Sequence, residues 1–410
     1  MLFEYGNAAM MVRPKNVMLI VVLVALVACV SHFYIADRLG FLRFVYPLES
    51  GVTQYRLSCS AGGPSWLVEV LQFANESQAS LANQVAYIAP DGAQFHCENG
   101  WQAGMLRSPA ITERTRFRYA SISKLFTADL ILELVNEGVL TLDTELQTIF
   151  PQELAVVKDE RIKSITIRQL LNHSAGFDRF KTPDPLFEHY DKPWCPYNPL
   201  VLADLALDFN PGAQTKYSNV GYCLLGMVAE RVTGVPYRQL VENQIENSGI
   251  RFIDGPYLAD EARYDFRYSD FYGSGYYKYF DFYALSSSAG LSGSAIDAAS
   301  EIKRMINRSP LNILSFSVPD GCDAKSFSRC YGLVLSIYKP SGGALKLLIQ
   351  NGFLPGTSSA AIIDDRGGIT VWLGSGTPPE GHRSTQKMNQ YIYDKLELYY
   401  SNIPTNSYNE

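Results

Sequence analysis

An apolar segment near the N-terminus, residues 17–36, contains no Asp, Glu, Lys or Arg. Its twenty residues are long enough for one helix to cross a bilayer. Arg13 and Lys15 precede it, as expected for an uncleaved anchor whose residues 1–16 stay in the cytoplasm. A cleaved signal sequence and a lipoprotein signal ending at Cys29 are the alternatives. The length of the apolar span favours the single-pass anchor.

The pattern changes three times before the middle of the chain. Residues 37–82 carry no clear periodicity and are interpreted as a connector. In residues 84–97, apolar and polar positions alternate on either side of the turn Pro90-Asp91-Gly92, and this pattern predicts a β-hairpin. Residues 119–137 are apolar on most sides and end before Gly138. This pattern predicts a helix buried in the centre of the domain.

Strand patterns return near the C-terminus. Residues 140–260 read as helices and loops, and a final helix is predicted over 384–399. Four apolar runs separated by turn signals predict strands at 333–338, 344–350, 359–364 and 369–374. Strands at both ends predict a mixed α/β fold of the α+β type. One antiparallel sheet would combine N- and C-terminal strands, and an inserted helical subdomain would cover one face. The predicted domain spans 83–400, and 401–410 form a tail.

Composition narrows the class of protein. Hydrophobic residues make up 47% and charged residues 19% of the chain, which is typical of a globular protein with a large core. The formal net charge is -6, and the sequence contains no basic run. Nucleic-acid binding therefore has no electrostatic support. The sequence leaves the oligomeric state open.

Six cysteines follow Cys29, and an even number is typical of an oxidising compartment. Cys322 and Cys330 close a short loop and are the first predicted disulfide pair. Cys59 and Cys97 are the second. No CxxC or HxxxH spacing occurs, so the sequence predicts no metal site.

The first motif with a chemical meaning is Ser121-Ile122-Ser123-Lys124 in the predicted central helix. Positions i and i+3 share a helical face, so the Ser121 hydroxyl and the Lys124 amine can meet. A hydroxyl becomes a good nucleophile only when a base takes its proton. Burial beside Leu125 and Phe126 would lower the pKa of Lys124 and allow it to be that base.

Two further motifs complete a candidate site. Tyr217-Ser218-Asn219 follows a Pro-Gly turn, so that Tyr217 can accept or relay a proton and Asn219 can bind a substrate amide. Gln350-Asn351-Gly352 ends a predicted strand, where a glycine lets substrate backbone approach closely. The backbone N–H groups of Ser121 and Phe353 would then form an oxyanion hole.

In this order the three motifs resemble the serine β-lactamase and penicillin-binding protein superfamily, and most closely its class C β-lactamase-like family, which includes DD-peptidases and esterases. Four other segments resemble it too: 165–177, 211–226, 287–299 and 351–359. The resemblance implies an acyl-Ser121 intermediate, Gln350, Asn351 and Gly352 beside the substrate, and no cofactor. It also implies a structural role for His173, in preference to a role in a catalytic triad.

Gln350 departs from the pattern of the family, which has Lys or His at this position. A neutral amide predicts weaker binding of a substrate carboxylate. The aromatic stretch 264–283 is interpreted as packing over the core, with a substrate-facing wall as the alternative.

Together these features predict an exported, membrane-anchored serine hydrolase with its catalytic domain on the non-cytoplasmic, periplasmic side. Its partners would be the membrane, through the apolar helix, and a small-molecule or peptide substrate that contains a peptide, ester or β-lactam acyl group. The alternative is a catalytically weak binding or scaffold protein of the cell envelope.

Overall fold

The computed structural model describes residues 14–105, 108–182, 184, 186, 192–255, 257–263, 265–270, 280–315 and 323–402. Residues 1–13, Cys322, most of the tail and part of the aromatic stretch 264–283 lie outside this description. The chain divides into two compact units, 1–48 and 49–410.

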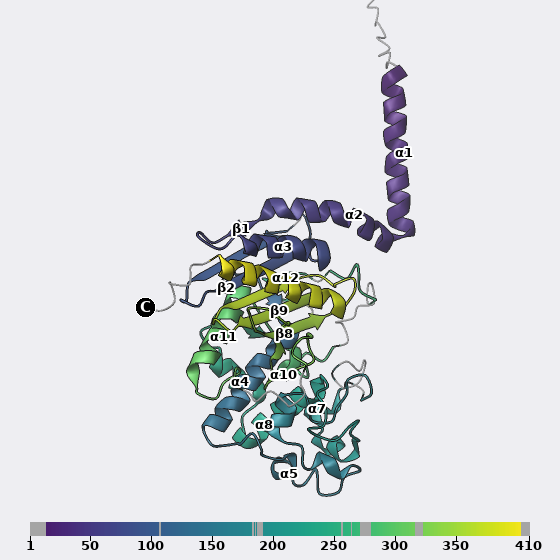
Figure 1. Cartoon of the computed structure of the whole chain (residues 1–410). Coiled ribbons are helices and arrows are strands. Elements are labelled where there is room, and N and C mark those ends of the chain that lie inside the picture. The colour runs from purple at the N-terminus through teal and green to yellow at the C-terminus, as the bar shows by residue number, and fades with distance from the viewer. Residues whose placement is uncertain are drawn as a thin grey trace, which may run out of the picture. The chain divides into compact units, whose positions relative to one another are not determined.

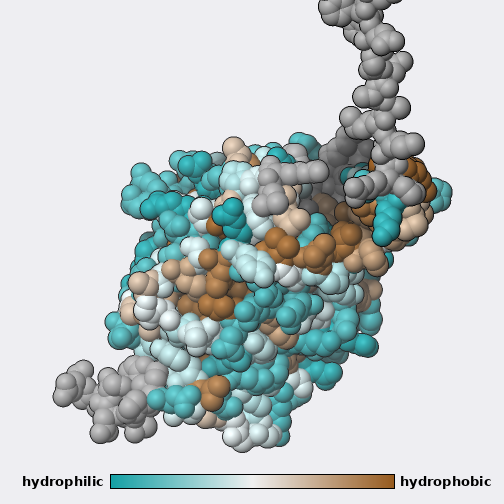
Figure 2. Space-filling view, turned by 90° about the horizontal axis from the view of Figure 1, so that it is seen from above, coloured by the Kyte–Doolittle hydropathy of each residue, from teal (hydrophilic) through white to brown (hydrophobic). Residues whose placement is uncertain are grey.

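The first unit contains helix α1 (Pro14–Ala36), which includes the predicted apolar segment. Its large apolar side chains are exposed, with exposed fractions between 37% at Phe33 and 80% at Ile35. Among the described residues it is the one helix that is long and apolar enough to cross a membrane. A signal sequence has the same properties, so α1 supports export and leaves open whether it stays attached. In contrast, most of the surface in Figure 2 is hydrophilic, with a few apolar patches.

A seven-stranded antiparallel sheet organises the second unit, in the order β1-β3-β2-β10-β9-β8-β7. Its strands are β1 (Ser58–Cys59), β2 (Ala82–Ile88), β3 (Gln94–Gly100), β7 (Ser336–Tyr338), β8 (Leu347–Leu354), β9 (Thr357–Asp364) and β10 (Ile369–Gly374). The predicted hairpin is β2–β3, and the predicted C-terminal strands are β7 to β10. N- and C-terminal strands meet where β2 pairs with β10, so the predicted sheet is confirmed (Figure 1).

Helices cover both faces of this sheet (Figure 1). On one face lie α3 (Trp66–Ser77) and α12 (His382–Ser401), with a core that includes Trp66, Trp372 and Ile392. The predicted connector 37–82 therefore needs correction, since α3 buries an apolar face against the sheet and is part of the folded domain. Helix α2 (Arg38–Thr53) and the short 3-10 helix η1 (Gln54–Arg56) precede it.

The inserted helical region lies on the other face, as predicted. Its helices are α4 (Ser123–Asn136), α5 (Leu146–Ile149), α6 (Ile167–Leu171), α7 (Trp194–Tyr197), α8 (Asn219–Thr233), α9 (Tyr237–Gln244), α10 (Ser286–Ala289) and α11 (Ala295–Arg308), with 3-10 turns η2 (Ala120–Ile122), η3 (Glu160–Ile162) and η5 (Pro199–Asp204). A small second sheet has the order β4-β6-β5, formed by β4 (Phe117–Arg118), β5 (Arg251–Phe252) and β6 (Leu291–Gly293). Helix α4 is almost wholly buried, because apolar residues occur around its whole circumference.

Two disulfides join described cysteines. The predicted pair Cys59–Cys97 is present and links β1 to β3. A second bond, Cys195–Cys223, joins α7 to α8 and was not predicted. Cys330 is also disulfide-bonded, but Cys322 lies outside the described residues, so that pairing stays a prediction.

These disulfides predict how many cysteine thiols of the denatured protein react with an alkylating reagent. Denatured without reduction, the full chain should react at Cys29 alone, because Cys29 is the free cysteine among those described. After reduction all seven cysteines should react. Alkylation followed by intact-mass measurement counts the thiols. Three or more reactive thiols before reduction would contradict the pairing, and a Cys29 that stays unreactive after reduction would indicate its lipidation.

Candidate active site

Ser121 lies in a tight turn, η2, immediately before the buried helix α4. The sequence predicts that Ser121 and Lys124 share one α-helix, whereas the structure places Ser121 one turn earlier, in 3-10 geometry. Residues i and i+3 eclipse one another in a 3-10 turn, so the two side chains still meet, at 3.3 Å between Lys124 Nζ and Ser121 Oγ. Ala120 has φ +48°, a left-handed conformation that costs an L-residue about 1–2 kcal/mol.

The sheet holds this strained turn in place. Gln350 Nε2, on β8, donates a hydrogen bond to the Ser121 carbonyl oxygen at 2.9 Å. Ser359 Oγ, on β9, donates to the Tyr119 carbonyl oxygen at 2.8 Å. Between these contacts β8 passes so close that a Cβ at Gly352 would lie 2.3 Å from the Tyr119 oxygen. Ser121 is thus held by the sheet on one side and by α4 on the other.

This close approach makes Gly352→Ala a sharp test. The added methyl would also lie 3.1 Å from the Ser121 nitrogen, so the turn or the strand must move. A displacement of about 1 Å near reacting groups can lower a rate about 10²-fold, and we expect a loss of acylation of at least that size. The rate of labelling of Ser121 by a fluorophosphonate measures it. Gly51→Ala is the matched control, because a Cβ there meets no atom within 4 Å. Equal rates in wild type and Gly352→Ala would contradict the role of this contact.

Lys124 is fully buried and lies within hydrogen-bond distance of Ser121. Besides Ser121 Oγ, its Nζ donates to Asn219 Oδ1 at 2.7 Å and to the Ser288 carbonyl oxygen at 2.9 Å. Burial lowers the pKa of Lys124 from its ordinary value to about 7, while the negative charge of Asp184 opposes this shift. At neutral pH a large fraction of Lys124 is therefore uncharged and able to accept a proton.

Tyr217 contacts the same oxygen from another side. Its hydroxyl donates to Ser121 Oγ at 2.7 Å, and burial raises its pKa to about 12. Tyr217 therefore carries its proton at neutral pH and acts first as a donor. The sequence left open whether Tyr217 accepts or relays the proton. That Lys124 accepts the proton of Ser121 stays a prediction.

His173 holds the segment that carries Tyr217. It is buried in a left-handed conformation, φ +61°, and its Nδ1 accepts a hydrogen bond from the Ser218 backbone N–H at 3.3 Å. Burial lowers the pKa of His173 well below its usual range, so the ring is neutral. Its ring packs 4.5 Å from the Tyr217 ring, between centroids. These contacts fit the structural role that the resemblance implies.

Asn219 links Lys124 to an acidic residue that sequence reasoning missed. Its Nδ2 donates to Asp184 Oδ2 at 2.6 Å, while its Oδ1 accepts from Lys124. Asp184 lies in a loop far from the three motifs in sequence, and no spacing marks it. Arg179, whose guanidinium lies 5.3 Å from the centroid of the Tyr217 ring, was missed for the same reason.

The predicted substrate-binding residues of β8 fall on opposite faces of the sheet. Alternation along the strand places Gln350 and Gly352 toward Ser121, and Asn351 and Phe353 away from it. Gln350 is 2% exposed and its side chain bonds the Ser121 carbonyl oxygen, so its predicted contact with substrate stays a prediction. Among the residues that the structure describes, buried Asn351 Oδ1 has no hydrogen-bond partner. Asn351 and Phe353 would reach a substrate through their backbone, and the oxyanion hole of Ser121 and Phe353 N–H groups likewise stays a prediction.

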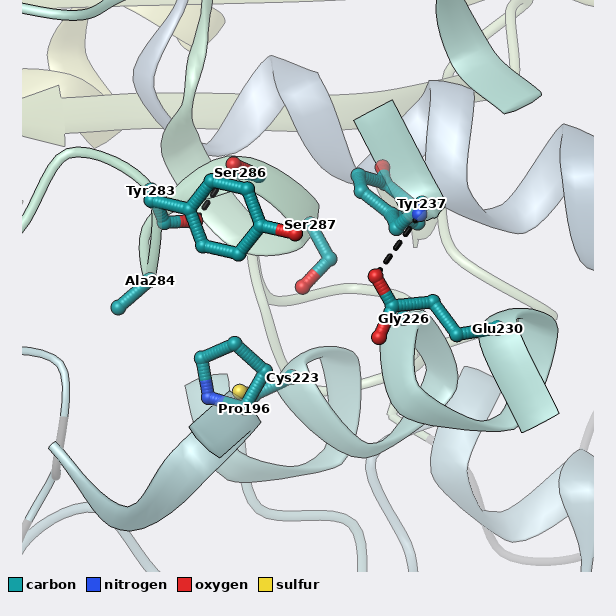
Figure 3. A pocket seen from close by; sticks show the side chains of 9 residues that line it. All are labelled: Pro196, Cys223, Gly226, Glu230, Tyr237, Tyr283, Ala284, Ser286 and Ser287. Atoms are coloured by element: carbon teal, nitrogen blue, oxygen red, sulfur yellow. Dashed lines mark hydrogen bonds between the residues drawn. The ribbon is translucent and has the colours of Figure 1, made fainter. Parts of the chain in front are cut away.

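A small cavity lies beside the site, between α8 and α10 (Figure 3). Cys223, Gly226 and Glu230 line it from α8, and Ser286 and Ser287 line it from α10. Ser121 is not part of its wall. Within the described chain, no group of three His, Cys, Asp or Glu side chains is placed to hold a metal ion.

Comparison with known families identifies the class of protein to which this sheet and the Ser121, Lys124 and Tyr217 site belong. A model of the Beta-lactamase family matches residues 79–299, and the chain belongs to this family. Nearly the whole chain is similar to a Dichelobacter nodosus protein named "Putative fimbrial assembly protein FimD, serogroup D". The two are 37% identical over 388 residues, which are 94% of this chain and 97% of the relative. Penicillin-binding protein 4 of Amycolatopsis lactamdurans is 29% identical over 142 residues, covering 33% of this chain and 35% of that protein.

Solved structures share the fold. The D-amino acid amidase of Ochrobactrum anthropi SV3 in complex with D-phenylalanine has a TM-score of 0.66 at 18% identity, covering 82% of this chain and 100% of that one. A penicillin-binding protein of Bacillus halodurans has a TM-score of 0.60 at 22% identity, covering 79% and 98%. The predicted fold and superfamily are thereby confirmed.

Proposed function

We propose that the protein is a serine hydrolase that acts through an acyl-Ser121 intermediate. The observation that carries the proposal is the convergence of two proton-handling groups on one oxygen. Tyr217 donates to Ser121 Oγ at 2.7 Å, and Lys124 Nζ lies 3.3 Å from the same atom. A buried lysine with a lowered pKa next to a serine hydroxyl is an arrangement that activates a nucleophile.

In the proposed acylation, neutral Lys124 takes the proton of Ser121 as Oγ attacks the carbonyl carbon of the substrate. The N–H groups of Ser121 and Phe353 stabilise the negative oxygen of the tetrahedral intermediate. When the intermediate collapses, Tyr217 gives its proton to the leaving group and recovers one from the Lys124 ammonium. A water molecule then attacks the acyl-Ser121 carbonyl and gives up a proton to neutral Lys124. Tyr217 passes its own proton to Oγ and recovers one from Lys124 as the bond from the carbonyl carbon to Oγ breaks, which releases the acid.

We infer that this chemistry takes place outside the cytoplasm. The disulfides Cys59–Cys97 and Cys195–Cys223 support an oxidising compartment. The exposed apolar helix α1 supports export and, if it is not cleaved, an anchor in the membrane.

The proposed substrates contain a peptide, ester or β-lactam acyl group. The names of the structural neighbours, which include a D-amino acid amidase, extend this range to amides of D-amino acids. The neutral, buried Gln350 favours substrates without a carboxylate near the nucleophile.

Intact-mass measurement tests the proposal on the full chain in detergent. Incubation with a fluorophosphonate should add one adduct to the wild-type protein and none to Ser121→Ala. A parallel incubation with a penicillin shows whether a peptide-like substrate fits. The absence of a fluorophosphonate adduct on the folded wild-type protein would overturn the proposal.

A second candidate is a role in the assembly of fimbriae without hydrolysis, on a penicillin-binding fold. The similarity to the FimD proteins of Dichelobacter nodosus over nearly the full chain favours it. Deletion of the gene in its own host should then reduce surface fimbriae, counted by electron microscopy. Restoration by Ser121→Ala would support this candidate, and restoration by the wild type alone would favour the hydrolase.

A further inference from the structure

We propose that Asp184 is a positioning residue of the Ser121 site, which acts through the Asn219 amide to orient Lys124. The inference rests on the proposed function and deepens it, because it assigns control of the base to a residue outside the three motifs. Only the contacts of Asp184 indicate this role, since no motif in the sequence around it does.

The first argument is the direction of the hydrogen bonds. Asp184 Oδ2 accepts from Asn219 Nδ2 at 2.6 Å, and Asp184 Oδ1 accepts from the Leu186 backbone N–H at 3.2 Å. An ionised carboxylate only accepts hydrogen bonds, so it dictates which end of the Asn219 amide faces it. The oxygen of the amide is then directed at Lys124 Nζ, 2.7 Å away. A rotated amide would place two oxygens against each other and an NH₂ group against the amine.

The second argument is the attachment of this loop to helix α8. Asn219 and Cys223 are four residues apart on α8, and such residues share a helical face. Cys223 is bonded to Cys195, in the segment that follows Asp184 along the chain. The disulfide attaches Cys195, and the hydrogen bond attaches Asp184, to the same face of α8.

The third argument is the set of groups around Lys124. Ser121 and Asn219 bind its Nζ directly, α10 contributes the Ser288 carbonyl, and the rings of Tyr217 and Tyr222 lie 5.1 and 5.4 Å from it. The positive charge of Lys124 contributes to the lowered pKa of His173, which is neutral. Two ionised side chains act on its charge in opposite directions: Asp184 favours the ammonium, and Arg179 disfavours it.

Because Asp184 and Arg179 carry opposite charges, removing one or the other should shift the titration midpoint of Lys124 in opposite directions. In full-length protein labelled with ¹³C at the lysine ε-carbons, the Lys124 signal is assigned by its loss in Lys124→Arg and followed with pH. Asp184→Asn removes the negative charge with little change in shape, so the midpoint of the titration should fall, on the order of one pH unit. Arg179→Gln removes the positive charge, and the midpoint should rise. Asp204→Asn, at an exposed carboxylate, is the control and should leave it unchanged.

Acylation by a fluorophosphonate supplies a second measurement. The rate should increase with pH through the Lys124 midpoint, because the neutral amine is the base. In Asp184→Asn this rise should begin at lower pH, and the plateau should fall at least about tenfold if the Asn219 amide loses its orientation. Asp184→Glu keeps the charge but displaces the carboxylate. It should therefore lower the plateau and leave the midpoint near that of the wild type, a result that also tests the proposal if Asp184→Asn does not fold.

The outcomes separate the two proposals. Midpoints that stay unchanged, or that move in the same direction in Asp184→Asn and Arg179→Gln, would overturn the role of Asp184. Opposite shifts of the midpoint without any adduct on wild-type Ser121 would support the control of Lys124 by Asp184 and would overturn the hydrolase itself. A lower plateau in Asp184→Asn with an unchanged midpoint would reduce Asp184 to a structural residue and would also overturn the inference.

Discussion

Ser121→Ala is expected to abolish the turnover of an activated ester and to leave the fold intact. The Oγ atom is the proposed nucleophile, and the described contacts of this side chain are those with Tyr217 and Lys124. Loss of a catalytic serine lowers the rate of a serine hydrolase by about four orders of magnitude or more. Alanine is well tolerated in helical turns, so the thermal midpoint should change little. Ester hydrolysis and a thermal melt, measured on the same preparation, check both parts.

The control for this variant is Ser164→Ala. Ser164 is an exposed serine whose hydroxyl donates to the Arg161 carbonyl, outside the site. It should keep the wild-type rate, which separates the loss of one hydroxyl from a general effect of mutation. If Ser121→Ala retains most of the hydrolysis, the proposed nucleophile is wrong.

The second large effect is expected when the proton-transfer pair is broken. Lys124→Ala removes the base and Tyr217→Phe removes the donor to Ser121 Oγ, and each should slow acylation about 10³-fold. Because both act on one oxygen in one step, the double variant should be little slower than the worse single variant. Single-turnover acylation with a fluorophosphonate measures all four rates of the cycle.

Lys216→Ala is the matched control for the lysine. Lys216 precedes Tyr217, and its side chain is exposed. Its rate of acylation should equal that of the wild type. Losses that multiply fully in the double variant would show that Lys124 and Tyr217 act independently, and the shared proton-transfer unit would have to be abandoned.

Local sequence determined much of this protein. Apolar alternation identified the strands from β7 to β10 and the hairpin β2–β3, because one face or both faces of each strand are buried in the same sheet. The Ser121–Lys124 pair was predictable because its two members are three residues apart, and both α- and 3-10 geometry bring such residues together. The short apolar helix α3 was missed, since its twelve residues follow a segment without clear pattern.

Tertiary structure decided which distant segments come together at the site, because a contact between distant segments leaves no periodic pattern in the local sequence. The two sides of β8 are an example: the sequence grouped Gln350, Asn351 and Gly352, and the pleat sends Gln350 toward Ser121 and Asn351 away from it. Gln350 also bonds the Ser121 carbonyl across 229 residues of chain.

The charge state of the base is decided in the same way. The sequence by itself predicted the pairing of Ser121 with Lys124 and the presence of the strands, because these depend on spacings of two to four residues. Only the folded chain places Asp184 on Asn219 and Arg179 beside Tyr217. Burial and these two charges set the pKa of Lys124, and both act through space between loops that the sequence does not connect.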